Sequence, residues 1–305
     1  MKQKLLAALS LCLTAVLASA ATPDAALIDR ITGLKGAATE AEGVFKVTKP
    51  RADLGATVEA RAMAPFMGFT SWAAFKVGGP AETMVMGDLV VQEDEVNPAM
   101  SALLDAGLEV TALHNHFFYE SPKIYFMHLG GEGTTEALAK GVRAALDAVA
   151  AVRAKSAMPA KDFGAGPLPA ENAITAAPLE AVFGAKAQVN VGMAKWVFGR
   201  EVMMACGCPA TKEMGVNSWA AFAGTDASAA VMGDFAVLEE ELTPVLKSLR
   251  RDGVNIVSIH HHMLRETPRM IFFHYYGRGT AAGLAAALKR ALVTQAAVPV
   301  KPAAP

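Results

Sequence analysis

The sequence predicts an α+β fold made of two tandem homologous domains, each a mostly antiparallel sheet with helices packed on one face. The first observation is a domain-sized duplication, because blocks of residues recur 146 or 147 positions apart. The recurring blocks are Ser71–Phe75 with Ser218–Phe222, Val85–Asp88 with Val231–Asp234, and His114–His128 with His260–His274. The second observation is that each copy mixes short apolar runs, typical of strands, with segments of helical periodicity. The third is a composition that is 53% hydrophobic and 19% charged, as in globular domains.

Composition divides the chain into five parts. Residues 1–20 have the features of a signal peptide: Lys2 and Lys4, an apolar run too short to span a bilayer, and small residues before a cleavage site near Ala20. We therefore expect a protein that is exported to the periplasm or secreted. The other parts are repeat domain 1 (21–150), a Pro/Gly/Ala-rich linker (151–170), repeat domain 2 (171–298) and a disordered tail (299–305).

Each copy is expected to open with a short helix, at 24–32 and at 171–183. Extended segments follow in the first copy at 44–47, 57–63, 72–76 and 83–91. Asn97 and Pro98 are typical of a helix N-cap and of the first helical position, and Gly107 is typical of a helix end.

The second half of each copy predicts a hairpin and a final helix. In the first copy, 108–118 and 123–129 alternate or run apolar, and they flank the turn residues 120–122. Thr134 is a suitable N-cap for a helix with an apolar face. The second copy repeats this order.

All seven histidines lie in two copied clusters, and His261 alone falls outside the copied pattern. The predicted metal ligands are His114, His116 and His128 in the first copy and His260, His262 and His274 in the second. Strand residues two apart face the same side, and a hairpin register that places His114 opposite His128 makes the rings converge. The same register places His260 opposite His274. Three imidazoles suit a divalent transition metal, with zinc first and copper or iron as alternatives.

Two pairs of carboxylates accompany the histidines. Glu120 and Glu266 are either turn residues or catalytic groups, as a fourth ligand or as the general base of a metal-dependent reaction. Asp88 and Asp234, each after a glycine at a strand end, are expected to cap a turn, with a hydrogen bond to a histidine ring as the alternative.

Cys206 and Cys208 remain after the expected cleavage and are separated by one residue. Their spacing is a poor disulfide framework for a domain of this size. The pair is open to three interpretations: a strained redox pair, a soft-metal site, or two small residues in a loop.

The stretches 87–131 and 233–277 resemble the LppY/LpqO family of bacterial envelope proteins, whose domain carries a histidine pair, a Glu–Pro turn and a later histidine. The positions that match this motif are His114, His116, Glu120 and His128, with their counterparts in the second copy. The resemblance implies an exported protein of duplicated architecture, and it implies little about chemistry.

The sequence leaves three functions open. The first is a metal-binding protein that acts as an enzyme, such as a hydrolase or lyase. The second is a non-enzymatic binding or metal-handling protein of the envelope. The third is a metal-free ligand-binding module. A net charge of −1 gives no basis for nucleic-acid binding. After the leader, no apolar stretch is long enough for a transmembrane helix, so the expected partner is a small molecule or an envelope component.

Overall fold

The computed structural model describes residues 22–78 and 83–299. The expected signal peptide and all but the first residue of the expected tail lie outside the described residues. Among the described helices, none combines the length and the hydropathy needed to cross a bilayer.

The first copy contains three helices and nine strands among its described residues. They are α1 (Ala25–Thr32), β1 (Gly36–Thr39), β2 (Val44–Pro50), β3 (Thr57–Val58), β4 (Arg61–Ala62), β5 (Thr70–Val77), β6 (Thr83–Gln92), α2 (Glu93–Asp105), β7 (Glu109–His114), β8 (Glu120–Ser121), β9 (Ile124–Gly133) and α3 (Thr135–Lys155). The Asp24 side chain caps α1 and the Thr134 side chain caps α3, each by accepting a backbone N–H from the first turn.

The second copy repeats this order without a counterpart of β8. Its elements are α4 (Ala176–Phe183), β10 (Gln188–Asn190), β11 (Met193–Gly199), β12 (Val202–Met203), β13 (Pro209–Ala210), β14 (Asn217–Gly224), β15 (Ala229–Leu238), α5 (Glu239–Arg251), β16 (Asn255–His260), β17 (Met270–Gly279) and α6 (Ala281–Ala297). The prediction of an α+β fold with antiparallel sheets is confirmed.

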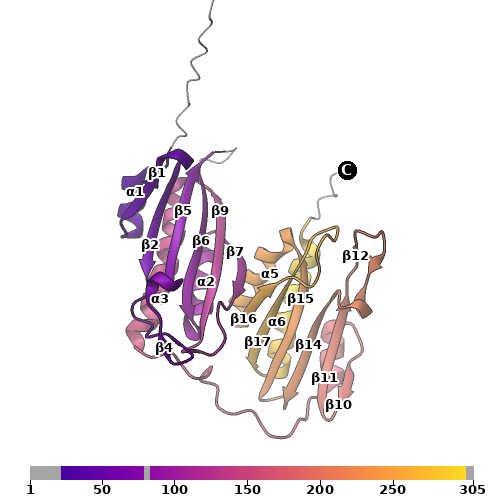
Figure 1. Ribbon diagram of the computed structural model, residues 1–305. Helices are drawn as coiled ribbons and strands as arrows, with labels where there is room; N and C mark the ends of the chain where they lie inside the picture. The colour runs from indigo at the N-terminus through magenta and orange to yellow at the C-terminus, as the bar shows by residue number, and fades with distance from the viewer. Residues whose placement is uncertain (1–21, 79–82, 300–305) are drawn as a thin grey trace, which may run out of the picture.

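The two copies share one twelve-stranded sheet, in the order β1-β2-β5-β6-β9-β7-β16-β17-β15-β14-β11-β10. The long helices lie behind the strands (Figure 1) and pack on one another, α2 on α3, α5 on α6 and α2 on α5. The main core fills the space between sheet and helices, with Phe75, Leu89, Phe235 and Phe273 among its buried side chains. None of the described α-helices lies on the opposite face of the sheet (Figure 1).

The helix expected to start at Asn97-Pro98 starts earlier, at Glu93. Gln92 is its N-cap, and the Glu95 carboxylate accepts the Gln92 backbone N–H at 2.8 Å. This hydrogen bond is the half of a capping box in which the N3 glutamate accepts from the N-cap residue. Because the helix starts at Glu93, Pro98 lies inside it. The expectation failed because the acidic run 93–95 forms the first turn itself.

The copies meet where β7 and β16 pair antiparallel, with Leu113 opposite Ile259. These residues occupy equivalent positions in the two copies, so the contact has approximate two-fold symmetry. The Asn97 side chain in α2 crosses this seam. It donates to the Ile256 carbonyl at 3.2 Å and accepts the Ile256 N–H at 2.8 Å.

Candidate metal centre

Asp88 and Asp234 lie within β6 and β15, and not in turns as expected from the sequence. Asp88 pairs directly with His128 on β9, and Asp234 pairs with His274 on β17. Both carboxylates are buried, with Asp234 only 2% exposed. Directly paired side chains in an antiparallel sheet have neighbouring Cβ atoms. Each copy therefore adds a buried carboxylate to its histidine cluster.

The glycine before Asp234 has a steric explanation. A Cβ atom at Gly233 would lie 2.0 Å from the Trp219 carbonyl and 2.3 Å from the Tyr275 hydroxyl, which donates to that carbonyl. Only glycine fits against this hydrogen-bonded pair. Because side chains alternate along a strand, the next residue, Asp234, faces the open side of the sheet.

A β-bulge sets the direction of the first histidine in each cluster. The pairing register shifts between Val110 and Ala112 in β7 and between Ile256 and Ser258 in β16. The extra residue reverses the alternation, so residues before and after the bulge can both face the core. Leu113 is then buried against the helices, and His114 faces the open side with His128.

The expected register of this hairpin is wrong by two residues. His114 lies opposite Phe126, and Ala112 lies opposite His128. In the second copy His260 lies opposite Phe272. The sequence suggested a tight turn at 120–122, whereas residues 120–121 form β8, which pairs with β3. A shift of two residues keeps the same face, so the histidines still gather.

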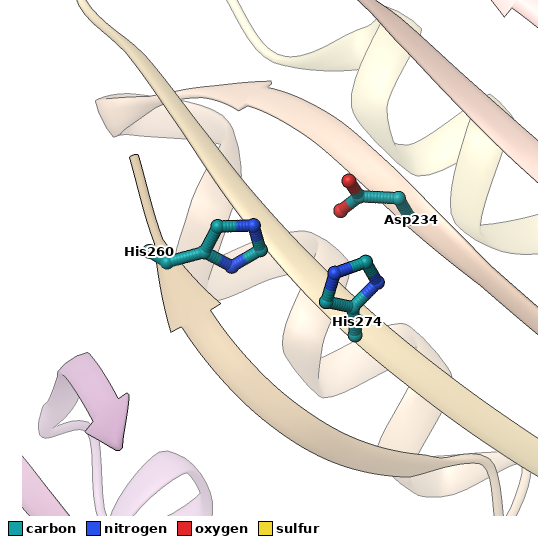
Figure 2. A group of neighbouring side chains, drawn as sticks. All are labelled: Asp234, His260 and His274. Carbon is teal, nitrogen blue, oxygen red and sulfur yellow. The ribbon is translucent and has the colours of Figure 1, made fainter. Parts of the chain in front are cut away.

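In the second copy three side chains, Asp234, His260 and His274, converge (Figure 2). Ligand atoms of Asp234, His260 and His274 all lie within 4.8 Å of one another, from three different strands. His262, in the loop after β16, approaches the same group. Its Nε2 lies 3.1 Å from His260 Nε2 and 3.3 Å from Asp234 Oδ2.

The hydrogen bond of His274 leaves one ring nitrogen free for a metal. Nδ1 of His274 lies 3.2 Å from the Gly233 carbonyl oxygen, which can only accept a hydrogen bond. With its proton on Nδ1, the neutral ring keeps its lone pair on Nε2. A backbone carbonyl commonly orients metal-binding histidines in this way.

Burial and mutual repulsion keep the cluster in a form that can bind a metal. Burial, together with the neighbouring His274, His262 and His261, lowers the pKa of His260 to about 4. His260 is therefore neutral near pH 7, as a metal ligand must be. Burial also raises the pKa of Asp234, because the carboxylate loses its hydration.

The donor set fits a metal ion. Asp234 Oδ1 and His260 Nδ1 are buried and have no hydrogen-bond partner among the described residues. Two ligand atoms about 2.0–2.1 Å from one tetrahedral zinc ion lie about 3.3 Å apart. The spacings from His262 to His260 and to Asp234, 3.1 and 3.3 Å, are close to this value.

The first copy has the same arrangement in a slightly looser form. The ring centroids of His114 lie 5.3 Å from His116 and 5.2 Å from His128. The corresponding distances in the second copy are 5.0 and 4.9 Å. Burial lowers the pKa of His116, and the charge of Asp88 opposes that shift. Asp88 Oδ1 is also buried and without a partner among the described residues.

A phenylalanine forms the floor of each cluster. The His116 ring stacks on Phe126 with centroids 3.2 Å apart, and the His262 ring stacks on Phe272 at 3.6 Å. Both phenylalanines belong to small hydrophobic clusters on the open face of the sheet, beneath the loops that carry β3–β4 and β12–β13. Stacking fixes the two histidines that lie outside regular strands.

Glu120 lies in β8, and Glu266 lies in the loop between β16 and β17. The Glu120 carboxylate accepts from Asn115 Nδ2 at 3.2 Å. Glu266 is buried, and its Oε1 accepts the Met270 backbone N–H at 3.1 Å. Its Oε2 has no partner among the described residues. Neither glutamate belongs to the group formed by Asp234, His260 and His274.

The two clusters face the same side of the continuous sheet, on either side of the seam. His114 and His260 each follow the Leu113–Ile259 pair by one residue, in opposite directions. With strands about 4.8 Å apart and a rise of about 3.3 Å per residue, their Cα atoms lie about 8 Å apart.

Sequence reasoning found all six histidines that cluster, and it placed the two aspartates in the wrong kind of element. The available signal was the Val-Met-Gly-Asp block itself, which recurs in both copies in register with the histidines. A charged residue that interrupts an apolar strand is a better candidate for a site than for a turn.

Comparison with known proteins identifies the family and leaves the chemistry open. Two solved structures match most of the chain at low identity: the trimeric bacterial microcompartment shell protein PduB, 13% identical over 85% of this chain and 89% of that one, with a TM-score of 0.22, and EtuB from Clostridium kluyveri, 10% identical over 87% and 90%, with a TM-score of 0.23. Such low TM-scores carry no argument here. No curated protein matches the sequence. The family described as Domain of Unknown Function (DUF1259) matches residues 26–148 and again residues 177–294. The chain therefore belongs to this family, as two tandem copies of its domain.

Proposed function

We propose that the chain is an exported metal-binding protein whose second copy holds a divalent transition metal, zinc in the first instance. The observation that carries the proposal is the convergence of Asp234, His260 and His274 within 4.8 Å, with a carboxylate oxygen buried and free to bind. His262 supplies a fourth donor. Three imidazoles and one carboxylate are a donor set typical of zinc, with copper or iron as alternatives.

Export is part of the proposal and rests on the leader alone. Lys2 and Lys4, the apolar run and the small residues before Ala20 support it. We also propose affiliation with the LppY/LpqO envelope proteins, which rests on the histidine motif shared by both copies.

A non-enzymatic role in metal binding or transfer is favoured over catalysis by one observation. The site lies on the open face of the sheet, and His262 is solvent-exposed, as is His116 in the first copy. Catalytic metal sites generally lie in concave pockets that exclude water. The partner is then a small metal complex or a component of the envelope.

A hydrolase or lyase remains the alternative, with Glu120 or Glu266 as the proposed general base. A metal at the site would supply Lewis-acid chemistry to such a reaction. The buried Oε2 of Glu266 supports this alternative, because it has no hydrogen-bond partner among the described residues and can accept a proton.

Elemental analysis of the chain, purified without a histidine tag, tests metal binding. We expect one tightly held metal ion per chain, lost in His274→Ala and kept in the matched variant His128→Ala. Absence of metal after loading with zinc, copper or iron would leave the metal-free ligand-binding module as the function. Ester, amide and phosphoester hydrolysis, measured with and without chelator and in Glu266→Gln, separates an enzyme from a carrier.

A further inference from the structure

The hairpin formed by β12 and β13 carries two free thiols at its tip, away from the histidine cluster described above. The turn is closed by backbone hydrogen bonds. The Met204 N–H donates to the Cys208 carbonyl at 2.9 Å, and the Gly207 N–H donates to the Met204 carbonyl at 2.8 Å. Gly207 has a φ of 78°, in the left-handed region that favours glycine. Cys206 and Cys208 flank this glycine on a tightly turned backbone.

The two thiols lie on one tight turn and are open to solvent. The Cys208 thiol donates a weak hydrogen bond to the backbone carbonyl oxygen of Cys206, with Sγ 3.9 Å from the oxygen. The neighbouring Cys208 thiol lowers the pKa of Cys206, and the Cys206 thiol raises the pKa of Cys208. Both residues are exposed and unbridged. A thiolate is the form that binds metals, so the lowered pKa favours Cys206 as a metal ligand. Cys208 lies on the same turn and can provide the second thiolate.

The equivalent hairpin of the first copy shows that the fold does not need these thiols. Strands β3 and β4 are joined by a two-residue turn, Glu59-Ala60, without cysteine. Each hairpin is tied to the loop after its histidine cluster, Thr57 pairing with Ser121 and Met203 with Thr267. The second copy therefore keeps the same hairpin and replaces its tip with a longer loop, 204–208.

The donors at this tip are few and soft. Among the described residues, neither cysteine belongs to a group of three or more histidine, cysteine or carboxylate ligands. Zinc requires about four such ligands in a structural site. The remaining nearby candidate is the thioether of Met203, which is 44% exposed at the base of the hairpin. Thiolates and thioethers select Cu(I), which accepts two-coordinate binding.

We propose that Cys206 and Cys208 form a Cu(I)-binding site on the β12–β13 hairpin, separate from the histidine site. Binding replaces two S–H bonds by two S–Cu bonds, releases two protons to solvent and changes no oxidation state. The assignment does not depend on a metal at the histidine cluster, because it uses none of the same side chains.

Anaerobic titration of the reduced full chain with Cu(I) held by bicinchoninate tests the site. We expect the chain to withdraw one Cu(I) ion per molecule and to develop a thiolate-to-copper absorption band in the ultraviolet. This ion should be lost in Cys206→Ser/Cys208→Ser. It should be kept in His260→Ala/His274→Ala, which leaves both hairpin cysteines in place.

Thiol accessibility provides a readout on the unmodified protein. Cu(I) should protect both hairpin thiols from reaction with Ellman's reagent, and a chelator of Cu(I) should restore the reaction. The proposal is overturned if the reduced chain takes no Cu(I) from bicinchoninate, or if the serine variant takes as much as the wild type. It is equally overturned if only His260→Ala/His274→Ala loses the ion, since copper would then occupy the histidine site.

Discussion

Asp234 combines deep burial with a carboxylate oxygen that has no partner among the described residues. Its pKa is raised by burial, so the ionised form at neutral pH weakens the folded state of the metal-free protein. A metal ion would reverse this effect, because it supplies the missing partner. Such a residue is typical of a site where binding takes precedence over stability.

Asp234→Asn should therefore change stability and binding in opposite directions. The amide removes the buried charge, so we expect the metal-free variant to unfold at a higher temperature than the wild type at pH 7. Its zinc affinity should fall by at least about ten- to a hundredfold. Calorimetric unfolding and a chromophoric zinc competition measure the two effects. Asp88→Asn, at the equivalent position of the first copy, is the matched control. A loss of stability with unchanged zinc affinity in Asp234→Asn would make Asp234 a structural residue.

His260 predicts a pH dependence of the metal-free protein. Its pKa in the folded state is about 4, below the ordinary value of 6.5, so the unfolded chain binds the proton more readily between these two values. The stabilisation is present above pH 6.5 and is lost as the pH falls toward 4. The ring is partly exposed, so the slope should stay below the limit of about 1.4 kcal/mol per pH unit for one full proton.

Urea unfolding from pH 7 to pH 4 measures this slope in the wild type and in His260→Asn. The variant should lose part of the acid sensitivity. Identical slopes in the two proteins would show that other groups account for it.

At the scale of elements, the sequence pattern predicted the strands well because strands such as β5 and β14 alternate buried and less buried positions. The features that the sequence pattern did not predict are a bulge and a register shift, and both depend on pairing between strands. The bulge between Val110 and Ala112 reverses the alternation, and the separate strand β8 moves the hairpin register by two residues. Neither has a distinctive local signal in the sequence. The histidines could be found because they are rare and copied, whereas Asp88 and Asp234 look like ordinary residues after a glycine.

An ion pair joins the end of β2 to the start of α2 and holds the loop that covers the first cluster. Both guanidinium Nη atoms of Arg51 donate to the Glu95 carboxylate, at 2.9 and 3.0 Å, and both side chains are buried. Nη1 also donates to the Val90 carbonyl. Arg153 contacts the same Glu95 carboxylate.

Arg51→Ala should lower the free energy of unfolding by about 3 kcal/mol, because it leaves Glu95 buried with one cation instead of two. Chemical denaturation measures the change. Lys140→Ala removes an exposed pair with Glu136 and should cost no more than about 0.5 kcal/mol. Equal effects of the two variants would contradict a role for the buried pair.

At the scale of the whole molecule, the continuous sheet depends on a seam that the sequence does not reveal. A duplication predicts two similar domains, but it does not predict how one packs on the other. That packing is set by side chains such as Asn97, which donates to the Ile256 carbonyl and accepts the Ile256 N–H. The equivalent of Asn97 in the second copy is Thr243, so the two halves of the seam differ in chemistry.

Asn97→Ala should weaken the seam by about 1–3 kcal/mol, since it leaves two buried backbone groups of β16 without partners. Thermal unfolding should occur at a lower temperature, and the two copies should unfold less cooperatively. Thr243→Ala is the control at the equivalent position and should change stability by less. An unchanged transition in Asn97→Ala would show that the seam is held by the β7–β16 and α2–α5 contacts alone.

The pairing of Leu113 with Ile259 has a further consequence for the history of the chain. Leu113 of the first copy pairs with Ile259, the equivalent residue of the second copy. Identical subunits pair in the same way across the two-fold axis of a symmetric dimer. A half-length ancestor could have closed its exposed β7 edge with a second molecule of itself. In the single polypeptide the halves need not be identical, and among the described residues the compact ligand cluster and the cysteine loop both occur in the second half.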